Sequence, residues 1–298
     1  MRYLITAFGG GHTSLALACM EKVRGEKFFV ILKNDEMSKV RMDALGLRYF
    51  VVVEPRRLGE SLLKPTVLFR FLINAFQSLK ILIHERPDVV ISTGPNPSIP
   101  VSLLAKLFGR RLVNVETVDR IIRPSLTARI LSLFADETWV HWEIQGGWFR
   151  NAKLVGPLVF EQESGVRVDL PRPIVAVFSG RRCYQDLLDA IGYVDRGIKC
   201  SWIIQTAGGS VKVENEALVK DFFTGASDLI RKADLVIGTG GLTAFEALAK
   251  GKPLILFPRK DTLEGHQVKQ ALYLSGKGRC WCVEDKKELK RVLTQILK

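Results

Sequence analysis

Residues 3–18 read Tyr-Leu-Ile-Thr-Ala-Phe-Gly-Gly-Gly-His-Thr-Ser-Leu-Ala-Leu-Ala, and this stretch decides the fold. The apolar run Tyr3–Phe8 predicts a buried strand, and residues from about 12 to 24 predict a helix. The glycines between them let the backbone approach a ligand, and the helix N-terminus beyond favours an anion. The spacing differs from the G-x-G-x-x-G dinucleotide pattern. His12 at the mouth of this loop either caps the helix or acts as a general base near neutral pH.

The same alternation of strand and helix continues through both halves of the chain. Further strands are predicted at Lys27–Leu32, Tyr49–Val53, Val89–Thr93, Leu112–Thr117, Glu137–Trp142, Ile174–Ser179, Ser201–Gln205, Leu235–Gly238 and Leu254–Phe257. Further helices are predicted at about 61–85, 97–108, 125–135, 184–195, 243–250, 265–275 and 286–297. Apolar strands separated by helices are typical of a parallel sheet covered on both faces. The sequence therefore predicts an α/β protein with two Rossmann-like, doubly wound domains and a cleft between them.

A polar, proline-containing segment separates the two predicted domains. Gly156-Pro157-Leu158 is followed by the charged stretch Glu161–Arg172 and then by Pro173. Such a composition is typical of a linker. We therefore expect a first domain over residues 1–157 and a second over residues 158–298.

The composition narrows the class of protein. The chain has 298 residues, a formal net charge of +13 and 47% hydrophobic residues, which excludes a disordered or fibrous chain. The basic excess favours anionic partners, but no nucleic-acid-binding module is recognisable, so we expect no nucleic-acid partner. Five cysteines without a framework spacing, and no secretory signal, predict a cytoplasmic protein.

A second glycine loop follows a predicted strand in the second half. It reads Gly-Thr-Gly-Gly-Leu-Thr-Ala-Phe-Glu over residues 238–246. Gly240 and Gly241 clear space for a pyrophosphate, and the Thr243 hydroxyl and backbone can hold it. Glu246, one turn into the helix, is placed to accept hydrogen bonds from a ribose. Further on, His266-Gln267 opens another predicted helix with groups suited to a hydroxyl-rich sugar.

These motifs carry a resemblance to a family of enzymes. The second half resembles UDP-GlcNAc transferases of the MurG type, and the catalytic subunit of the transferase that adds the second sugar in dolichol-linked N-glycan assembly. The first half resembles that enzyme's membrane-recruiting partner subunit. The matching pieces are Gly10–Thr13, Glu54–Arg57, Arg86–Pro95, Val115–Arg120, Phe134–Asp136, Phe178–Gly180, Ile203–Gly209, Gly238–Glu246 and His266-Gln267.

The resemblance implies a metal-independent GT-B glycosyltransferase without a cofactor, acting by inversion. Its expected function is transfer of GlcNAc from UDP-GlcNAc to a GlcNAc-pyrophosphate polyprenol or dolichol, on the cytoplasmic face of the membrane. His12 is the expected general base, and Glu116 is either a competing base, the carboxylate that orients His12, or a structural anion. The expected donor-binding residues are Ser179, Gly180, Gln205, Gly240, Gly241, Leu242, Thr243, Glu246, His266 and Gln267. The expected acceptor- or phosphate-binding residues are Gly10, Gly11, Thr13, Arg56 and Arg57.

Three alternatives stay open at this stage. The same architecture serves glucuronosyltransferases, so UDP-glucuronate is a second donor. The other two alternatives are a UDP-GlcNAc 2-epimerase and a non-catalytic membrane scaffold. The apolar segment Leu62–Ile83 is interrupted by charges, so we expect it not to span a bilayer; it either packs on the sheet or rests in an anionic membrane interface.

Overall fold

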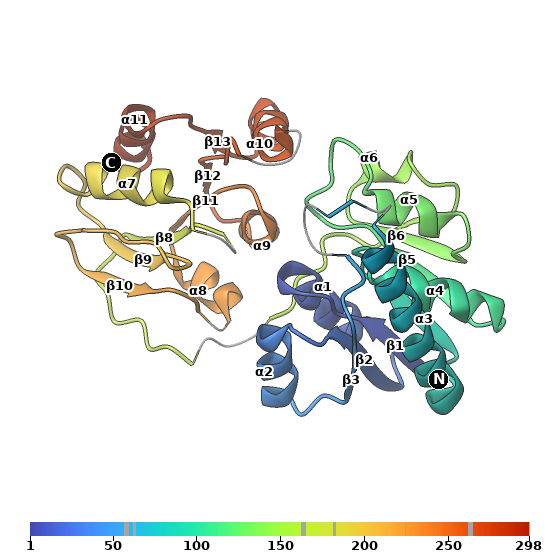
Figure 1. The fold of residues 1–298 in the computed structure, drawn as a ribbon. Coiled ribbons are helices and arrows are strands. Elements are labelled where there is room, and N and C mark those ends of the chain that lie inside the picture. The colour runs from blue at the N-terminus through green and yellow to red at the C-terminus, as the bar shows by residue number, and fades with distance from the viewer. Residues whose placement is uncertain are drawn as a thin grey trace. The chain divides into compact units, whose positions relative to one another are not determined.

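The computed structural model divides the chain into two compact units, Met1–Phe160 and Glu161–Lys298. It describes residues 1–56, 60–61, 64–161, 165–180, 183–223, 225–261 and 265–297, without the side chains of Leu242 and His266. Each unit is a parallel sheet with helices on both faces (Figure 1). This confirms the predicted fold class.

The first unit is a seven-stranded sheet with the order β3-β2-β1-β4-β5-β6-β7. Its elements are β1 (Arg2–Thr6), α1 (Gly10–Glu21), β2 (Glu26–Leu32), α2 (Glu36–Ala44), β3 (Tyr49–Val52), α3 (Pro65–Glu85), β4 (Val89–Ser92), α4 (Ser98–Leu107), β5 (Arg111–Val115), α5 (Leu126–Ser132), β6 (Glu137–Val140), α6 (Glu143–Gly146) and β7 (Ala152–Leu154). Apolar residues of α1 and α2 pack on one face of this sheet, and those of α3 and α4 pack on the other.

The second unit is a six-stranded sheet with the order β10-β9-β8-β11-β12-β13. Its elements are β8 (Ile174–Phe178), α7 (Gln185–Asp195), β9 (Ser201–Gln205), β10 (Ala217–Lys220), α8 (Ala226–Lys232), β11 (Leu235–Gly238), α9 (Leu242–Ala249), β12 (Leu254–Leu256), α10 (His266–Gly276), β13 (Trp281–Cys282) and α11 (Lys286–Ile296). Helices α7 and α11 share one apolar core with the central strands, around the fully buried Trp202.

The division between the units lies three residues beyond the expected boundary at 157. Leu158 and Phe160 are buried in the core of the first unit, and the Arg41 guanidinium lies 5.6 Å from the centre of the Phe160 ring. Glu161, in contrast, forms an ion pair with Lys250 of the second unit. The burial of Leu158 and Phe160 therefore attaches these residues to the first unit.

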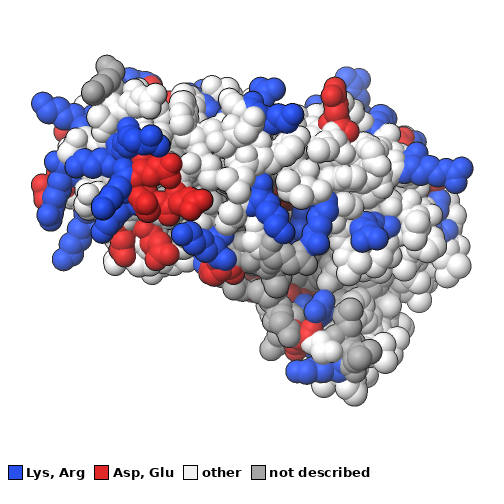
Figure 2. Space-filling view, turned by 90° about the horizontal axis from the view of Figure 1, so that it is seen from above, with Lys and Arg blue, Asp and Glu red and all other residues white. Residues whose placement is uncertain are grey.

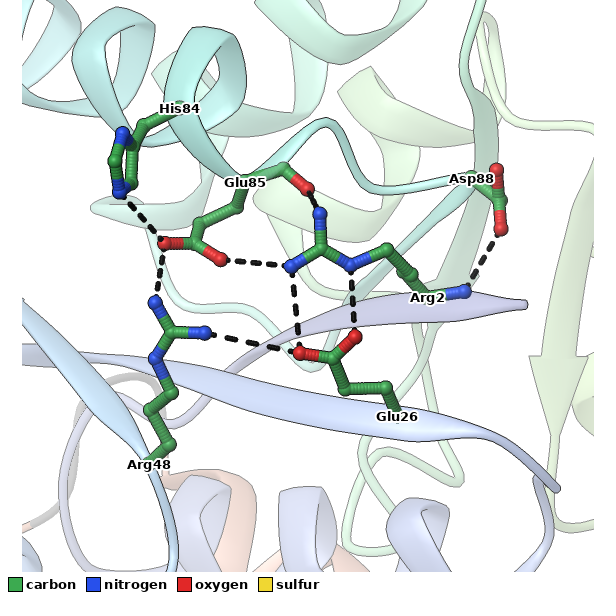
Figure 3. Close-up of polar contacts among 6 residues, drawn as sticks. All are labelled: Arg2, Glu26, Arg48, His84, Glu85 and Asp88. Atoms are coloured by element: carbon green, nitrogen blue, oxygen red, sulfur yellow. Dashed lines mark hydrogen bonds and ion pairs between the residues drawn. The ribbon is translucent and has the colours of Figure 1, made fainter.

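The last residue of α3, Glu85, is fixed at the N-terminal ends of the strands by an ion-pair network in which its carboxylate is the buried member (Figure 3). The Glu85 carboxylate is 2% exposed and accepts hydrogen bonds from Arg2 at 2.9 Å and Arg48 at 2.5 Å. Glu26 pairs with the same two arginines. A buried carboxylate with two cationic partners is costly to disturb, because removing either partner leaves charge uncompensated. The network lies at the end of the sheet opposite to the glycine loop.

Helix α3 covers most of the apolar segment for which the sequence left two roles open. By length and composition alone it could cross a membrane, because it has 21 residues and an 18-residue window of it has a mean hydropathy of 1.5. In this fold, however, one face of α3 is bonded to the end of β3: Asn74 donates to the Val53 carbonyl and Gln77 accepts from the Val53 N–H, both at 2.8 Å. It is therefore a surface helix of the first unit. Leu62 and Leu63 lie outside the described residues.

Candidate active site

His12 lies where the strand order of the first sheet reverses. Strand β1 pairs with β2 on one side and β4 on the other, so the loops that follow β1 and β4 diverge at their carboxyl ends. Ligands of open α/β sheets bind at such a switch point. Gly9 and Gly10 both adopt positive φ, which lets α1 begin immediately after the strand and brings His12 to this edge.

The His12 ring is held in one orientation by the loop after β4. Its Nδ1 lies 2.7 Å from the Thr93 carbonyl oxygen, which can only accept a hydrogen bond. Nδ1 is therefore the protonated nitrogen, and in the neutral ring Nε2 carries the lone pair. Thr93 itself is anchored to Thr6 of β1 through both its hydroxyl and its N–H, at 2.7 and 3.0 Å. The tautomer that a general base needs is thus fixed by the fold.

The other residues of the first glycine loop contribute mainly through the backbone. The His12 and Thr13 N–H groups donate to the Gly9 carbonyl, so helix geometry directs the Gly10 and Gly11 N–H groups out of the helix end. The Thr13 side chain is buried, and its hydroxyl bonds to Ser38 at 2.6 Å and Ala7 at 3.3 Å. It therefore ties α1 to α2 and does not face solvent.

Glu116 is buried at the end of β5 and organises the loop that follows. One carboxylate oxygen accepts from the Thr117 N–H and the other from the Ser125 N–H, each at 2.8 Å. Burial raises the pKa of Glu116 to about 7, with a smaller contribution from Asp119, although both backbone hydrogen bonds favour the ionised form. Since the Nδ1 of His12 is bonded to Thr93 and both Glu116 oxygens are bonded to this loop, the structure places Glu116 as a loop anchor.

Arg56, one of the two predicted arginines, follows β3 at the edge of the sheet. Arg56 is half-buried and its Nε donates to the Glu60 carbonyl at 2.7 Å. Strand β3 is separated from β1 by β2, which corresponds to roughly 10 Å between β1 and β3. Arg57 lies outside the described residues.

The second unit repeats the switch point between β8 and β11. The loops after these two strands carry Ser179-Gly180 and Thr239-Gly240-Gly241. The Ser179 hydroxyl is buried and donates to the Gln205 carbonyl at 2.9 Å. The Gln205 side chain accepts from the Phe223 N–H at 3.1 Å and donates to the Gly180 carbonyl at 3.5 Å. Ser179 and Gln205 thus shape the loops through their side-chain bonds.

The structure brings two predicted donor residues, Gly240 and Gln267, together. Gly240 has φ +99°, and a Cβ on it would lie 3.7 Å from the Gln267 Cβ. Gly241 is the N-cap of α9, so the first N–H groups of this helix follow the loop directly. The Gln267 side chain also accepts from the Arg259 N–H at 3.4 Å.

The remaining predicted donor residues are in or beside the same helices. Thr243 and Glu246 are half-buried on α9, and Leu242 and His266 begin α9 and α10. The side chains of Leu242 and His266 are outside the described part of the structure. Within the described part, no group of three or more His, Cys, Asp or Glu residues could hold a metal ion.

Three residues at these two edges were missed in the sequence. Thr93 orients His12; Gln145, fully buried in α6, bonds the loop after β5; and the Arg259 side chain binds Asp261 and the Cys183 carbonyl. Thr93 belongs to a stretch that carried the family resemblance. It contacts His12 through its backbone carbonyl, however, and a pattern of side chains does not reveal such a role. The bonds from Gln145 to Thr117 and from Arg259 to Cys183 span long sequence separations, so spacing gave no indication of them.

Comparison with known proteins defines the class of each half. Residues 4–158 match the family described as oligosaccharide biosynthesis protein Alg14 like, and residues 204–298 match the glycosyltransferase family 28 C-terminal domain. A UDP-N-acetylglucosamine--N-acetylmuramyl-(pentapeptide) pyrophosphoryl-undecaprenol N-acetylglucosamine transferase of Bacillus thuringiensis is 25% identical, over 93% of this chain and 84% of that protein. The enzyme of the same name from Chlorobium luteolum is 29% identical, over 93% and 83%.

Solved structures share the whole fold. MurG from Acinetobacter baumannii superposes with a TM-score of 0.69 at 15% identity, over all of this chain and 90% of that one. The UDP-GlcNAc 2-epimerase of Methanocaldococcus jannaschii gives 0.67 at 14% identity, over 100% and 92%. Because transferases and an epimerase fit comparably well, this likeness establishes the fold and does not choose the reaction.

The two doubly wound units and the matches to both halves define a glycosyltransferase of the GT-B type, made of two parts in one chain. The chain belongs to the Alg14-like family of oligosaccharide biosynthesis proteins, and residues 204–298 match the glycosyltransferase family 28 C-terminal domain. The expectation of a fused, two-part transferase is confirmed.

Proposed function

We propose that this protein transfers GlcNAc, with inversion, from UDP-GlcNAc to a GlcNAc that is linked by pyrophosphate to a polyprenol or dolichol. The observation that carries the proposal is the His12–Thr93 hydrogen bond of 2.7 Å at the switch point of the Alg14-like unit, which puts the proton of the neutral ring on Nδ1 and its lone pair on Nε2. The names of the bacterial relatives support both a UDP-GlcNAc donor and a lipid pyrophosphate acceptor. The Alg14-like half favours an oligosaccharide precursor over a peptidoglycan one.

In the proposed reaction the acceptor hydroxyl oxygen attacks C1 of the donor sugar. The new C1–O bond forms as the bond between C1 and the phosphate oxygen breaks, and UDP leaves with that electron pair. The acceptor proton passes to Nε2 of His12. The N–H groups that follow Gly240 and Gly241, together with the dipole of α9, stabilise the charge that develops on UDP. No metal is needed for these steps, and we expect activity to persist in EDTA.

Because the proposed acceptor carries a lipid, we expect the protein to contact the membrane surface, and we propose that helix α3 makes this contact. Five large apolar side chains on this helix are 57–64% exposed: Leu68, Phe69, Leu72, Phe76 and Ile83. Lys80 lies beside this face, with its Nζ 4.6 Å from the centre of the Phe76 ring. An exposed apolar helix face with a basic flank is suited to the interface of an anionic leaflet. The protein would then act on the cytoplasmic face.

One experiment tests the activity directly. Purified protein is incubated with UDP-GlcNAc or UDP-glucuronate and a short-chain GlcNAc-pyrophosphate lipid or an N-acetylmuramyl-pentapeptide pyrophosphate lipid, and products are identified by mass. We expect a product only with UDP-GlcNAc and the GlcNAc lipid. Four outcomes would each point to a different function and contradict the proposal. These are transfer of glucuronate, use of the muramyl lipid, chemical change of UDP-GlcNAc without an acceptor, and UDP binding without turnover.

A further inference from the structure

The loop between β5 and α5, residues 117–125, is held by buried side chains at both of its ends. Glu116 binds the N–H groups of Thr117 and Ser125, as described above. The Trp142 indole donates to the Val118 carbonyl at 2.8 Å. The loop therefore has a defined conformation, although no helix or strand forms within it.

Gln145 makes the central contribution to this arrangement. Its side chain is fully buried, and its Nε2 donates to the carbonyls of Thr117 at 3.0 Å and Arg120 at 2.8 Å. Its Oε1 accepts from the N–H groups of His141 at 2.7 Å and Trp142 at 3.2 Å. Both donors and both lone pairs of the amide are used. Few side chains other than an amide can make this set of bonds, because it requires two donors and an acceptor in one plane.

The consequence of these bonds is a fixed backbone at Arg120. Its carbonyl is bonded to Gln145, and its N–H donates to the Thr117 carbonyl at 3.1 Å. The neighbouring Ile121 is buried, whereas the Arg120 side chain is half-buried and Arg123 is exposed. The loop thus presents basic side chains from a rigid base.

The loop lies beside the site of His12. Strand β5 is the direct neighbour of β4, and both loops follow the carboxyl ends of their strands. The Thr127 hydroxyl, just after the 117–125 loop, donates to the Asn96 side chain at 2.7 Å. Asn96 belongs to the same loop as Thr93, whose carbonyl is bonded to His12. A cationic side chain on the 117–125 loop is therefore at the same edge of the first sheet as His12, where we expect the acceptor to bind.

We propose that Gln145 is a positioning residue, which sets the backbone of Arg120 so that its guanidinium binds the phosphate oxygens of the acceptor. This rests on the proposed function. Arginine suits this role because its planar fork can bind two phosphate oxygens at once. Gln145 does not touch the substrate; it acts through Arg120.

The test compares Gln145→Glu with wild type over a range of pH, with separate Michaelis constants for donor and acceptor. The ionised carboxylate keeps both acceptor bonds to His141 and Trp142 but has no donor for the Thr117 and Arg120 carbonyls. We expect an acceptor KM raised by about tenfold at pH 8, with an unchanged donor KM. Because burial favours the neutral form, the carboxyl becomes protonated as the pH is lowered and regains one donor, so the acceptor KM falls back toward wild type.

Three comparisons make this result specific. Since Glu116, Asp119, His141 and Arg120 also surround the loop, the acceptor KM is read as the ratio of variant to wild type at each pH. Gln77→Glu is the matched control, because Gln77 uses its side-chain oxygen to accept from Val53 and a carboxylate keeps that bond; its acceptor KM stays unchanged. Arg120→Gln raises the acceptor KM, and adding Gln145→Glu to it raises it little further, because both changes remove the same contact.

The outcomes separate this proposal from the proposed function. If wild type transfers no sugar to any lipid acceptor, the proposed function fails. If wild type is active but Gln145→Glu leaves the acceptor KM unchanged, shifts donor and acceptor KM equally, or adds fully to Arg120→Gln, the positioning role is wrong. Hydrogen exchange of residues 117–125 checks the loop itself: we expect it to be faster in Gln145→Glu at pH 8 and close to wild type at the lower pH.

Discussion

The two units arrange their central strands in the same order, yet they place different chemistry at the point where that order reverses. In the first unit the edge carries an imidazole whose tautomer is fixed by a backbone carbonyl. In the second it carries paired glycines at the start of a helix, with a glutamine packed against one of them. The comparison teaches that the sheet supplies a position, whereas the residues after each central strand decide which groups stand there: an imidazole in the first unit and the N–H groups of a helix N-terminus in the second.

The largest expected effect comes from removing the imidazole. We expect His12→Ala to lower kcat by about 10² to 10⁴-fold, because a positioned base contributes that much. Binding of UDP should be unchanged, since it depends on the second unit. Turnover is measured with the lipid acceptor and UDP binding by calorimetry. The proposal that the first unit supplies the base and the second binds UDP would be wrong in either of two cases. These are unchanged turnover in a folded variant, and loss of UDP binding together with turnover.

The next effect tests the glycine loop of the second unit. Gly240→Ala places a Cβ at φ +99° and beside Gln267, so we expect the donor KM to rise by about tenfold or more through a distortion of about 1–2 kcal/mol. Gly278→Ala is the control, because Gly278 also has a positive φ (+65°) but no atom within 4 Å of the added methyl group. If both variants lose stability equally and neither changes the donor KM, Gly240 has only a conformational role.

A third prediction separates the surfaces of the two units. Replacing Phe69 and Phe76 by Ser should reduce binding to vesicles that contain anionic lipid by about tenfold or more, because two aromatic side chains leave the interface. Phe222→Ser with Leu272→Ser removes similarly exposed apolar side chains, 44% and 54%, from the second unit. Flotation assays should show no loss for that pair. Equal loss in both would mean that vesicle binding does not depend on α3.

The smallest effect concerns the anchor of the 117–125 loop. The pKa of Glu116 is raised to about 7 in the folded state, so the folded protein binds a proton that the unfolded chain has already released. The contribution of this group to the free energy of unfolding therefore rises by about 1 kcal/mol as the pH falls from 8 to 6. Urea unfolding at both pH values should show this gain in wild type and not in Glu116→Gln. The pKa of His141 is lowered by burial, which acts in the opposite sense below about pH 6.5 but is common to both proteins.

The basic excess is divided among separate groups on one face of the molecule. The net charge of +13 could have formed one basic surface. On the face shown in Figure 2, however, Lys and Arg side chains lie in separate groups with broad uncharged areas between them, and acidic residues accompany several groups. On that face, the basic excess is therefore spread out.

Strands that are buried along their whole length were predictable from the sequence, whereas two mostly exposed elements were not. The buried runs at Tyr3–Phe8 and Ile174–Ser179 overlap β1 and β8 closely, because a strand buried on both faces must be apolar throughout. Strand β10 was missed because three of its four residues are exposed, so no burial pattern marks it. Helix α2 was missed because only Ser38 and Met42 are buried on it.

Individual site residues show the same division. The sequence by itself determined the two glycine loops, the helices behind them and the presence of His12 after the first strand, because each depends on neighbouring residues. Only the tertiary structure decided that Thr93 fixes the His12 ring, that Thr13 faces Ser38, and that Glu116 and Gln145 hold the 117–125 loop. The physical reason is that backbone carbonyls and buried amides gain their role from partners far along the chain, and such partners meet only when the strands are ordered in a sheet.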